Sequence, residues 1–207
     1  MIILVCCQKQ TKMIIGIMGA VGSGKDTCGD YLASTHEFRK VAFAKRVKDV
    51  AHAAFGWDRE LLEGATAESR AWRERVDPVW GFSPRHALQK IGTEMFRAHL
   101  DADIWVKAVR NELTASPEQN FVITDVRFEN EVDMIKALGG HIVYVERGRQ
   151  PDWTAEARAG RPYDESCGVH VTDWNSYALT CRADICIFNN GELRDLYTRL
   201  DSLVQLL

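Results

Sequence analysis

The sequence has no large excess of charge of either sign. It contains 26 lysines and arginines against 29 aspartates and glutamates, which gives a formal net charge of −3 at pH 7. Proteins that hold nucleic acid or an anionic membrane over a broad surface carry a strong positive excess. We therefore expect neither nucleic acid nor membrane as a partner. Any phosphate binding must come from a local arrangement of residues.

The six cysteines lack the spacing of zinc ligands, and Cys181 and Cys186 are too far apart for a C-x-x-C redox pair. We interpret them as reduced thiols, which are typical of a cytoplasmic protein.

A long hydrophobic run is also absent. Residues 1–7 are apolar, but Lys9 and Lys12 follow them, so the run is too short to span a bilayer. This start also lacks the basic residues and the small-residue cleavage site of a secretory signal. Residues 1–12 are either a dispensable extension from an upstream start codon, with Met13 as the alternative start, or an added edge strand. The sequence leaves both interpretations open.

Internal repeats, low-complexity tracts and linker-like segments are absent as well, so the 207 residues suit a single domain. Apolar runs alternate with segments of helical periodicity, which indicates a parallel sheet covered by helices on both faces. The expected architecture is a three-layer α/β/α fold with a five-stranded, mainly parallel sheet. The predicted strands are residues 13–18, 39–44, 121–124, 141–145 and 184–188.

The predicted helices cover residues 25–34, 46–55, 83–100, 104–113 and 129–138 and a last amphipathic segment with Leu193, Leu196, Leu200, Leu203 and Leu207 on its apolar face. Ser83-Pro84 is a typical helix start, and Gly139-Gly140 is a typical stop. Two segments depart from the alternation. Residues 56–100 include a tryptophan-bearing stretch (56–82). They are interpreted as an excursion from the sheet that binds the acceptor, meaning the molecule that receives a transferred group. Residues 147–170 are polar and rich in arginine, which suggests a mobile, lid-like loop.

Residues 19–27, Gly-Ala-Val-Gly-Ser-Gly-Lys-Asp-Thr, follow an apolar strand and precede a helix. They match the phosphate-binding pattern G-x-x-x-x-G-K-[ST], except that Asp26 stands between the lysine and the threonine. Backbone N–H groups at such a helix start hold phosphate oxygens, and the glycines permit positive φ and leave room for them. We expect Lys25 to reach the β- and γ-phosphates and Thr27, rather than Asp26, to ligate Mg²⁺. The predicted nucleotide contacts are Gly19, Gly22, Ser23, Gly24, Lys25, Asp26 and Thr27.

Asp125 ends the apolar run 121–124, which is the form of a second Mg²⁺-associated motif that acts through water. Arg127 follows at the carboxyl end of that strand, where open parallel sheets place their ligands. A guanidinium there can hold a phosphate bidentately. The alternative is a surface arginine paired with Glu129 or Glu131. Lys25, Asp125 and Arg127 are thus the candidate catalytic residues.

Arg85, Gln89 and Thr93 recur every four residues and share one face of the helix predicted from Ser83. This polar stripe is either a solvated face or a surface that holds the phosphate and base of an acceptor, together with Arg127.

Four arginines lie between the fourth and fifth predicted strands, and arginines on a closing loop can stabilise a moving phosphoryl group while water is excluded. A solvated flexible loop is the alternative. The candidates are Arg147, Arg149, Arg158 and Arg161.

No Ser/His/Asp or Cys/His constellation is evident, and His170 is interpreted as a hydrogen-bonding loop residue. A phosphate acceptor needs no catalytic base, because its second pKa is about 6 and it is already an anion at neutral pH. Catalysis then depends on positioning and charge neutralisation.

The motifs together resemble the phage-type deoxynucleoside monophosphate kinases, which are P-loop kinases. The resemblance lies in Gly24-Lys25-Asp26-Thr27, in Arg85-x-x-x-Gln89-x-x-Gly92-Thr93-Glu94 with Ile104-Trp105-Val106, in Thr124-Asp125-Val126-Arg127 with Glu131, in His170-Val171-Thr172-Asp173 and in Asn189-Asn190-Gly191-Glu192-Leu193. It runs from about Met13 to the C-terminus and is patchy over residues 56–82. Members often have Ser-Glu where this chain has Thr172-Asp173.

The resemblance implies ATP and Mg²⁺ as the donor system and a deoxynucleoside monophosphate as the acceptor. It implies that Lys25 and Thr27 serve the donor, that Arg85, Gln89 and Arg127 serve the acceptor, and that the loop with Asn189 and Gly191 lies near the adenine. A phage enzyme would act in the host cytoplasm. The expected partners are small nucleotides, and a homodimer remains open.

Two other functions remain as alternatives. One is another small-molecule kinase on the same scaffold, of the dephospho-coenzyme A kinase or phosphomevalonate kinase type; the latter also has a Gly-Lys-Asp loop. The other is a nucleotide-binding switch or regulatory ATPase without an acceptor.

Overall fold

The computed structural model describes residues 12–169 and 171–207. The two interpretations of the first twelve residues, apart from Lys12, and the interpretation of His170 therefore lie outside the described residues. The chain forms two compact units. The first, here called the sheet unit, comprises residues up to 40 and from 113 onwards. The second, the helical unit, comprises residues 41–112. Each is described by itself.

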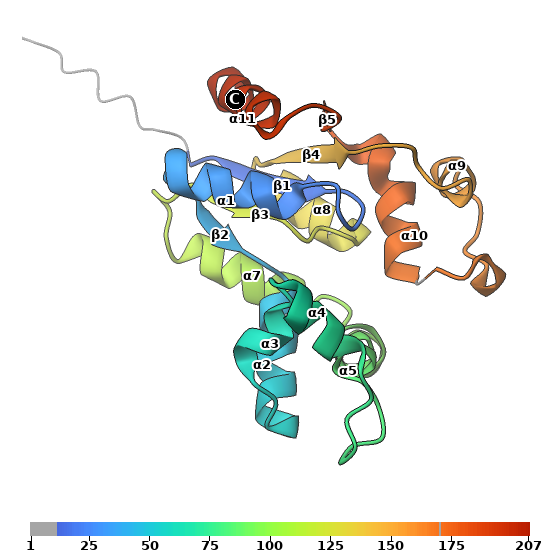
Figure 1. The fold of residues 1–207 in the computed structure, drawn as a ribbon. Coiled ribbons are helices and arrows are strands. Elements are labelled where there is room, and N and C mark those ends of the chain that lie inside the picture. Colours follow the sequence, from blue (N-terminus) through green and yellow to red (C-terminus); the bar gives the residue numbers. More distant parts are fainter. Residues whose placement is uncertain (1–11, 170) are drawn as a thin grey trace, which may run out of the picture. The chain divides into compact units, whose positions relative to one another are not determined.

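The sheet unit is built on five strands in the order β2-β3-β1-β4-β5. Their bounds are β1 Ile14–Met18, β2 Arg39–Val41, β3 Phe121–Ile123, β4 His141–Glu146 and β5 Ile185–Phe188. All strands run parallel, and Gly16 of β1 lies opposite Ile123 on one side and Ile142 on the other. This confirms the predicted α/β class and parallel sheet (Figure 1). β2 is shorter than predicted, because the chain turns into a helix at Ala44.

Helices cover both faces of this sheet, because successive side chains of β1 point to opposite faces and both sets are apolar. Ile15 and Ile17 are fully buried in a cluster with residues of α1 (Lys25–Thr35) and α11 (Leu193–Leu206). Gly16 faces the other way, towards α8 (Glu129–Ala137), where a Cβ on it would lie 2.6 Å from Cδ1 of Ile135. The absence of a side chain at Gly16 therefore lets α8 pack closely on the strand. Gly139, with φ 75°, ends α8 as predicted.

The segment between β4 and β5 contains helices that the sequence analysis did not predict, while its lid-like role stays a prediction. Its elements are α9 (Trp153–Arg158), the 3₁₀ turn η2 (Glu165–Cys167), α10 (Val171–Ala178) and the 3₁₀ turn η3 (Leu179–Arg182). Trp153 stacks on Trp174 with ring centroids 6.0 Å apart and meets Tyr177 edge-on at 5.0 Å. This aromatic packing between α9 and α10 gives the polar segment an apolar core of its own. Both helices lie beyond the carboxyl ends of the strands (Figure 1).

The helical unit comprises α2 (Ala44–Phe55), α3 (Arg59–Glu63), α4 (Ala67–Glu74), α5 (Pro84–Gln89), the π-helix η1 (Lys90–Met95), α6 (Phe96–His99) and most of α7 (Ile104–Thr114). Ser83 caps α5 by accepting a hydrogen bond from the backbone N–H of His86, as the Ser-Pro pair predicts. The single helix predicted over 83–100 is instead divided by the π-helix.

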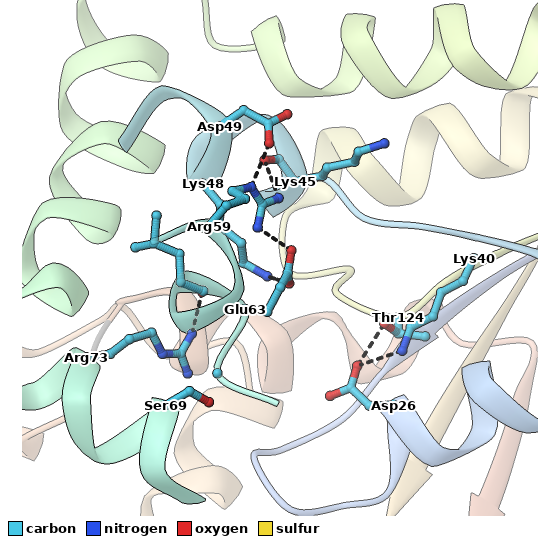
Figure 2. A network of polar contacts seen from close by, with 12 residues as sticks. Asp26, Lys40, Lys45, Lys48, Asp49, Arg59, Glu63, Ser69, Arg73 and Thr124 are labelled. Atoms are coloured by element: carbon cyan, nitrogen blue, oxygen red, sulfur yellow. Dashed lines mark hydrogen bonds and ion pairs between the residues drawn. The ribbon is translucent and has the colours of Figure 1, made fainter. Parts of the chain in front are cut away.

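Aromatic rings and charged pairs hold the helical unit together. Trp57, which is buried, lies at the centre of edge-to-face contacts with Trp72 and Phe82. A network of ion pairs connects α2 and α3, in which Glu63 accepts from Lys48 and Arg59, and Arg59 also binds Asp49 at 2.7 Å (Figure 2). Within the described ranges, no helix combines the length and apolar character needed to cross a membrane.

Candidate nucleotide-phosphate site

The loop between β1 and α1 has the backbone conformation that its glycines predict. Gly19, Gly22 and Gly24 have φ values of 156°, 80° and 98°. At two of these positions a side chain would also collide with the structure: a Cβ on Gly19 would lie 2.5 Å from the carbonyl oxygen of Val145, and one on Gly24 2.5 Å from Nδ2 of Asn189. The loop is thus a close-fitting turn at the N-terminus of α1, where backbone N–H groups attract anions.

Asn189 forms the support beneath this loop. The side chain is 8% exposed and donates a hydrogen bond of 2.8 Å to the carbonyl oxygen of Ser23, while its backbone N–H donates to Glu146 at 2.7 Å. Asn189 therefore ties the loop after β5 to the phosphate loop and to the end of β4. Gly191 lies further along, where a Cβ on it would lie 2.3 Å from Oδ2 of Asp195 in the first turn of α11.

Two side chains of the loop carry donors suited to phosphate. The hydroxyl of Ser23 is buried and has no hydrogen-bond partner among the described residues. Lys25 opens α1, and its Nζ donates to the carbonyl oxygen of Ala20 at 3.3 Å, so the side chain bends back over the loop. Buried hydroxyls are normally paired. The free hydroxyl of Ser23 is therefore consistent with an oxygen-rich ligand in the loop.

Asp26 is tied to the neighbouring strand (Figure 2). Its Oδ1 accepts a hydrogen bond of 3.0 Å from the hydroxyl of Thr124 and lies 3.7 Å from Nζ of Lys40, which also pairs with Asp30 at 2.8 Å. Thr124 is 2% exposed, and a Cβ on Gly29 of α1 would lie 2.3 Å from its methyl group. The helix thus packs directly on the residue that orients Asp26.

Thr27 and Asp125 are the predicted Mg²⁺ residues, and both are half-buried, in the first turn of α1 and just after β3. A hydroxyl and a carboxylate are hard oxygen ligands of the kind that Mg²⁺ takes, usually with several waters retained. No group of three or more histidine, cysteine or acidic side chains gathers as a metal cage among the described residues. The donor set therefore fits a metal held jointly with phosphate oxygens rather than by the protein alone.

Arg127 follows β3, and its position is fixed through a buried carboxylate. Glu131 is 1% exposed and accepts hydrogen bonds from the backbone N–H groups of Arg127, at 2.7 Å, and Phe128, at 3.1 Å. A carboxylate is well placed at the first turn of α8, because the helix dipole favours negative charge there. The alternative sequence interpretation considered Glu131 only as a side-chain partner, whereas here it orients the backbone that carries Arg127.

The four arginines predicted as lid candidates differ in what holds them. Arg158 is the most constrained: it pairs with Glu146, donates to the hydroxyl of Tyr144 at 3.0 Å, and lies over the rings of Tyr144 and Tyr177 at 5.6 and 5.5 Å. Arg161 pairs with Glu156 at 2.7 Å on the surface. The other two, Arg147 and Arg149, have exposed side chains.

Burial alone would lower the pKa of Arg158, but its bonds to Glu146 and Tyr144 outweigh burial and hold that pKa above its ordinary value. Burial raises the pKa of the Cys28 thiol in α1 to about 12, which keeps it protonated and unreactive. The four described cysteines, Cys28, Cys167, Cys181 and Cys186, are free thiols.

The acceptor-side candidates other than Arg127 lie in the helical unit. Arg85 and Gln89 are on α5, and Arg85 pairs with Glu74 of α4 at 2.7 Å. Thr93 lies in the π-helix η1, which follows α5 directly. The indole Nε1 of Trp105 donates to the carbonyl oxygen of Gly92 at 2.9 Å, which links two of the motifs singled out in the sequence.

Comparison with known proteins gives a consistent family. The family model for deoxynucleotide monophosphate kinase matches residues 67–200. A predicted deoxynucleotide monophosphate kinase of Acanthamoeba polyphaga mimivirus is 30% identical over 208 residues, covering 93% of this chain and 96% of that protein. The deoxynucleotide monophosphate kinase of Enterobacteria phage T4 is 22% identical over 256 residues, covering 94% and 99%. The deoxynucleoside-5′-monophosphate kinase of Escherichia phage T5 is 26% identical, covering 60% and 72%.

Among solved structures, TT1252 from Thermus thermophilus is similar with a TM-score of 0.51 and 21% identity, covering 96% of this chain and 99% of that one. This similarity concerns the fold.

Proposed function

Because the chain belongs to the deoxynucleotide monophosphate kinase family, we propose that it transfers the γ-phosphoryl group of ATP to a deoxynucleoside monophosphate, which yields the diphosphate and ADP. Family membership makes the chain an ATP-dependent phosphotransferase that acts on nucleotides. The observation that supports the transfer to a deoxynucleoside monophosphate is the phosphate loop, in which Asp26 follows Lys25. Asn189 holds this loop through its hydrogen bond to Ser23, and Asp125 and Arg127 follow strand β3.

In this proposal the donor binds along the loop of residues 19–27. The backbone N–H groups at the start of α1 and the hydroxyl of Ser23 hold its phosphates, and Lys25 neutralises the charge between the β- and γ-groups. The loop of Asn189 and Gly191 is placed beside the adenine. Thr27, and Asp125 through water, would hold Mg²⁺, which neutralises charge on the transferred group when bound.

The acceptor needs no general base, because its phosphate is an anion at neutral pH. Arg127 holds that phosphate bidentately, and Glu131 fixes the backbone of Arg127 in place. Arg85, Gln89 and Thr93 supply further acceptor contacts from the helical unit. Arg158 is the lid arginine best prepared for catalysis, because Glu146 and two tyrosine rings already order its side chain.

An acceptor panel tests the proposal directly. The full chain is incubated with γ-labelled ATP, Mg²⁺ and each of the four common deoxynucleoside monophosphates, their ribose counterparts, dephospho-coenzyme A and phosphomevalonate. Label is expected in one or more deoxynucleoside diphosphates. Transfer to the pantetheine or mevalonate compound and to no nucleoside monophosphate would contradict the proposal. ATP hydrolysis at a rate that no monophosphate changes would instead indicate a switch or ATPase.

A further inference from the structure

Arg73 has an unusual position in the helical unit. It lies on α4, and its guanidinium is packed against the C-terminal end of α3, where Nη1 donates to the carbonyl oxygen of Leu62 at 3.4 Å (Figure 2). A Cβ on Gly64 would lie only 2.2 Å from Cζ of Arg73. Gly64, with φ 68°, thus leaves the space that the guanidinium occupies. The side chain is therefore held in one place before any ligand arrives.

Most N–H donors of the Arg73 guanidinium make no hydrogen bond within the described residues. A guanidinium has five N–H donors, but among the described residues Arg73 makes only the long bond to Leu62 and has no ion pair. Its Nε is buried without a hydrogen-bond partner. A buried donor left unpaired costs free energy, which natural structures usually avoid unless a ligand uses the donor.

A second arginine reaches the same surface. Arg85 at the start of α5 pairs with Glu74, the residue next to Arg73 on α4, at 2.7 Å, and both members of that pair are about half exposed. Burial first, and then the positive charge of Arg85, lower the pKa of Arg73. Glu63, the other nearby carboxylate, is already held by Lys48 and Arg59. Two guanidiniums thus share one available carboxylate, which leaves positive charge to be balanced.

We propose that Arg73 and Arg85 together hold the phosphate monoester of the acceptor nucleotide. This rests on the proposed function, which makes the acceptor a monophosphate. Arg73 supplies the preformed part of the site, because packing has already fixed its guanidinium. Arg85 supplies the adjustable part, because its exposed partner Glu74 can give way to a dianion.

Arg73→Met tests this with Arg75→Met as the matched control, since Arg75 is exposed and lies just past the end of α4. Calorimetry measures the affinity for each deoxynucleoside 5′-monophosphate that the wild type binds and for the same deoxynucleoside without phosphate. In Arg73→Met the affinity for the monophosphate is expected to fall roughly 10- to 100-fold, the effect of losing hydrogen bonds to a charged group. The deoxynucleoside affinity and the KM for ATP should remain within about twofold of wild type, a change too small to reflect a lost charged hydrogen bond.

A merely structural role for Arg73 gives a different result, because it would weaken nucleoside and monophosphate alike. Equal losses for both ligands, or equal behaviour of Arg73→Met and Arg75→Met, would overturn the proposal. If Arg73→Met does not fold, Arg73→Gln decides, since its amide can still donate to the carbonyl oxygen of Leu62. A wild-type monophosphate affinity in Arg73→Gln would then overturn the proposal.

The test also separates failure of this site from failure of the proposed function. If the wild-type chain neither binds nor phosphorylates any monophosphate, the proposed function and this site are both wrong. If the wild type phosphorylates a monophosphate and the Arg73 variants bind it with unchanged affinity, only the proposed site is wrong.

Discussion

The hydroxyl of Thr124 donates a hydrogen bond of 3.0 Å to Oδ1 of Asp26, which joins the residue after β3 to the first turn of α1. Thr124 is buried and Asp26 is exposed, so the strand fixes the direction of a carboxylate that faces solvent. The residue that departs from the common phosphate-loop pattern is thus held by the segment that carries Asp125 and Arg127.

Thr124→Val removes this bond while keeping the volume of the side chain. We expect kcat to fall by about 3- to 10-fold, which corresponds to about 1 kcal/mol; this is less than a buried hydrogen bond to a charged group contributes, because Asp26 is exposed. The Mg²⁺ concentration for half-maximal rate should also rise, because Asp26 lies beside the predicted metal residue Thr27. Thr124→Ser keeps the hydroxyl and serves as the control. Wild-type kinetics of Thr124→Val at all Mg²⁺ concentrations would show that the bond is not needed.

Lys25→Met should reduce turnover by roughly 100- to 1,000-fold, because a preorganised charge at the transferring group is lost. The melting temperature should stay near that of the wild type, since Lys25 is only half-buried at the start of α1. Lys136→Met, at a surface pair with Asp184, is the control and should retain activity. Comparable turnover in the two variants would remove Lys25 from the donor site.

Arg127→Ala should mainly weaken acceptor use. Loss of a bidentate guanidinium is expected to raise the KM for the monophosphate by roughly 10- to 100-fold and to leave the KM for ATP nearly unchanged. Arg182→Ala is the control, because Arg182 pairs with Glu129 and Asp133 of the same helix α8. Steady-state kinetics with each substrate varied separately give the answer. Unchanged acceptor kinetics in Arg127→Ala would refute the acceptor assignment.

Two alanine variants in the phosphate loop separate backbone strain from collision. Gly22 and Gly24 both have positive φ, so each substitution to alanine should cost about 1–2 kcal/mol of stability. Only at Gly24 does the new methyl group also meet Nδ2 of Asn189; at Gly22 nothing lies within 4 Å. Gly24→Ala should therefore be the less stable in urea denaturation and bind ATP more weakly. Equal effects at both sites would mean that Asn189 yields without cost.

Stability should depend on pH through Asp184. Burial alone would raise the pKa of this carboxyl, but hydrogen bonds from Lys136 and from the backbone N–H of Ile142, each 2.8 Å, outweigh it and hold the pKa below its ordinary value. The group therefore contributes its full stabilisation above the unfolded pKa of about 3.9, and this is lost as pH falls through the lower folded pKa. Asp184→Asn should melt below the wild type at pH 7, with the gap closing towards pH 3. A gap independent of pH would contradict this.

Much of the sheet could be predicted because its signals are local. The central strands β1 and β3 are buried along their whole length, so their apolar runs are uninterrupted. The phosphate loop could be predicted because its glycines are required by backbone geometry, which the positive φ values of Gly22 and Gly24 bear out.

Other features depend on residues that are distant in the sequence. Helix α9 was missed because its stability comes from Trp174 and Tyr177, about twenty positions later, rather than from its own polar sequence. In the sequence, Arg73 does not differ from other charged residues of a helix. Its position depends on the space that Gly64 leaves for its guanidinium. The π-helix that begins at Lys90 likewise could not be predicted, because the composition of this segment is that of an ordinary helix.

Asn189 lies 166 positions from Ser23 and yet fills the space that a side chain at Gly24 would need. These two positions should consequently vary together among relatives. A relative with alanine in place of Gly24 is expected to carry a residue shorter than asparagine in place of Asn189, and asparagine should persist wherever the glycine does. The phosphate loop and the turn after the last strand would thus evolve as one unit, although nearly the whole chain separates them.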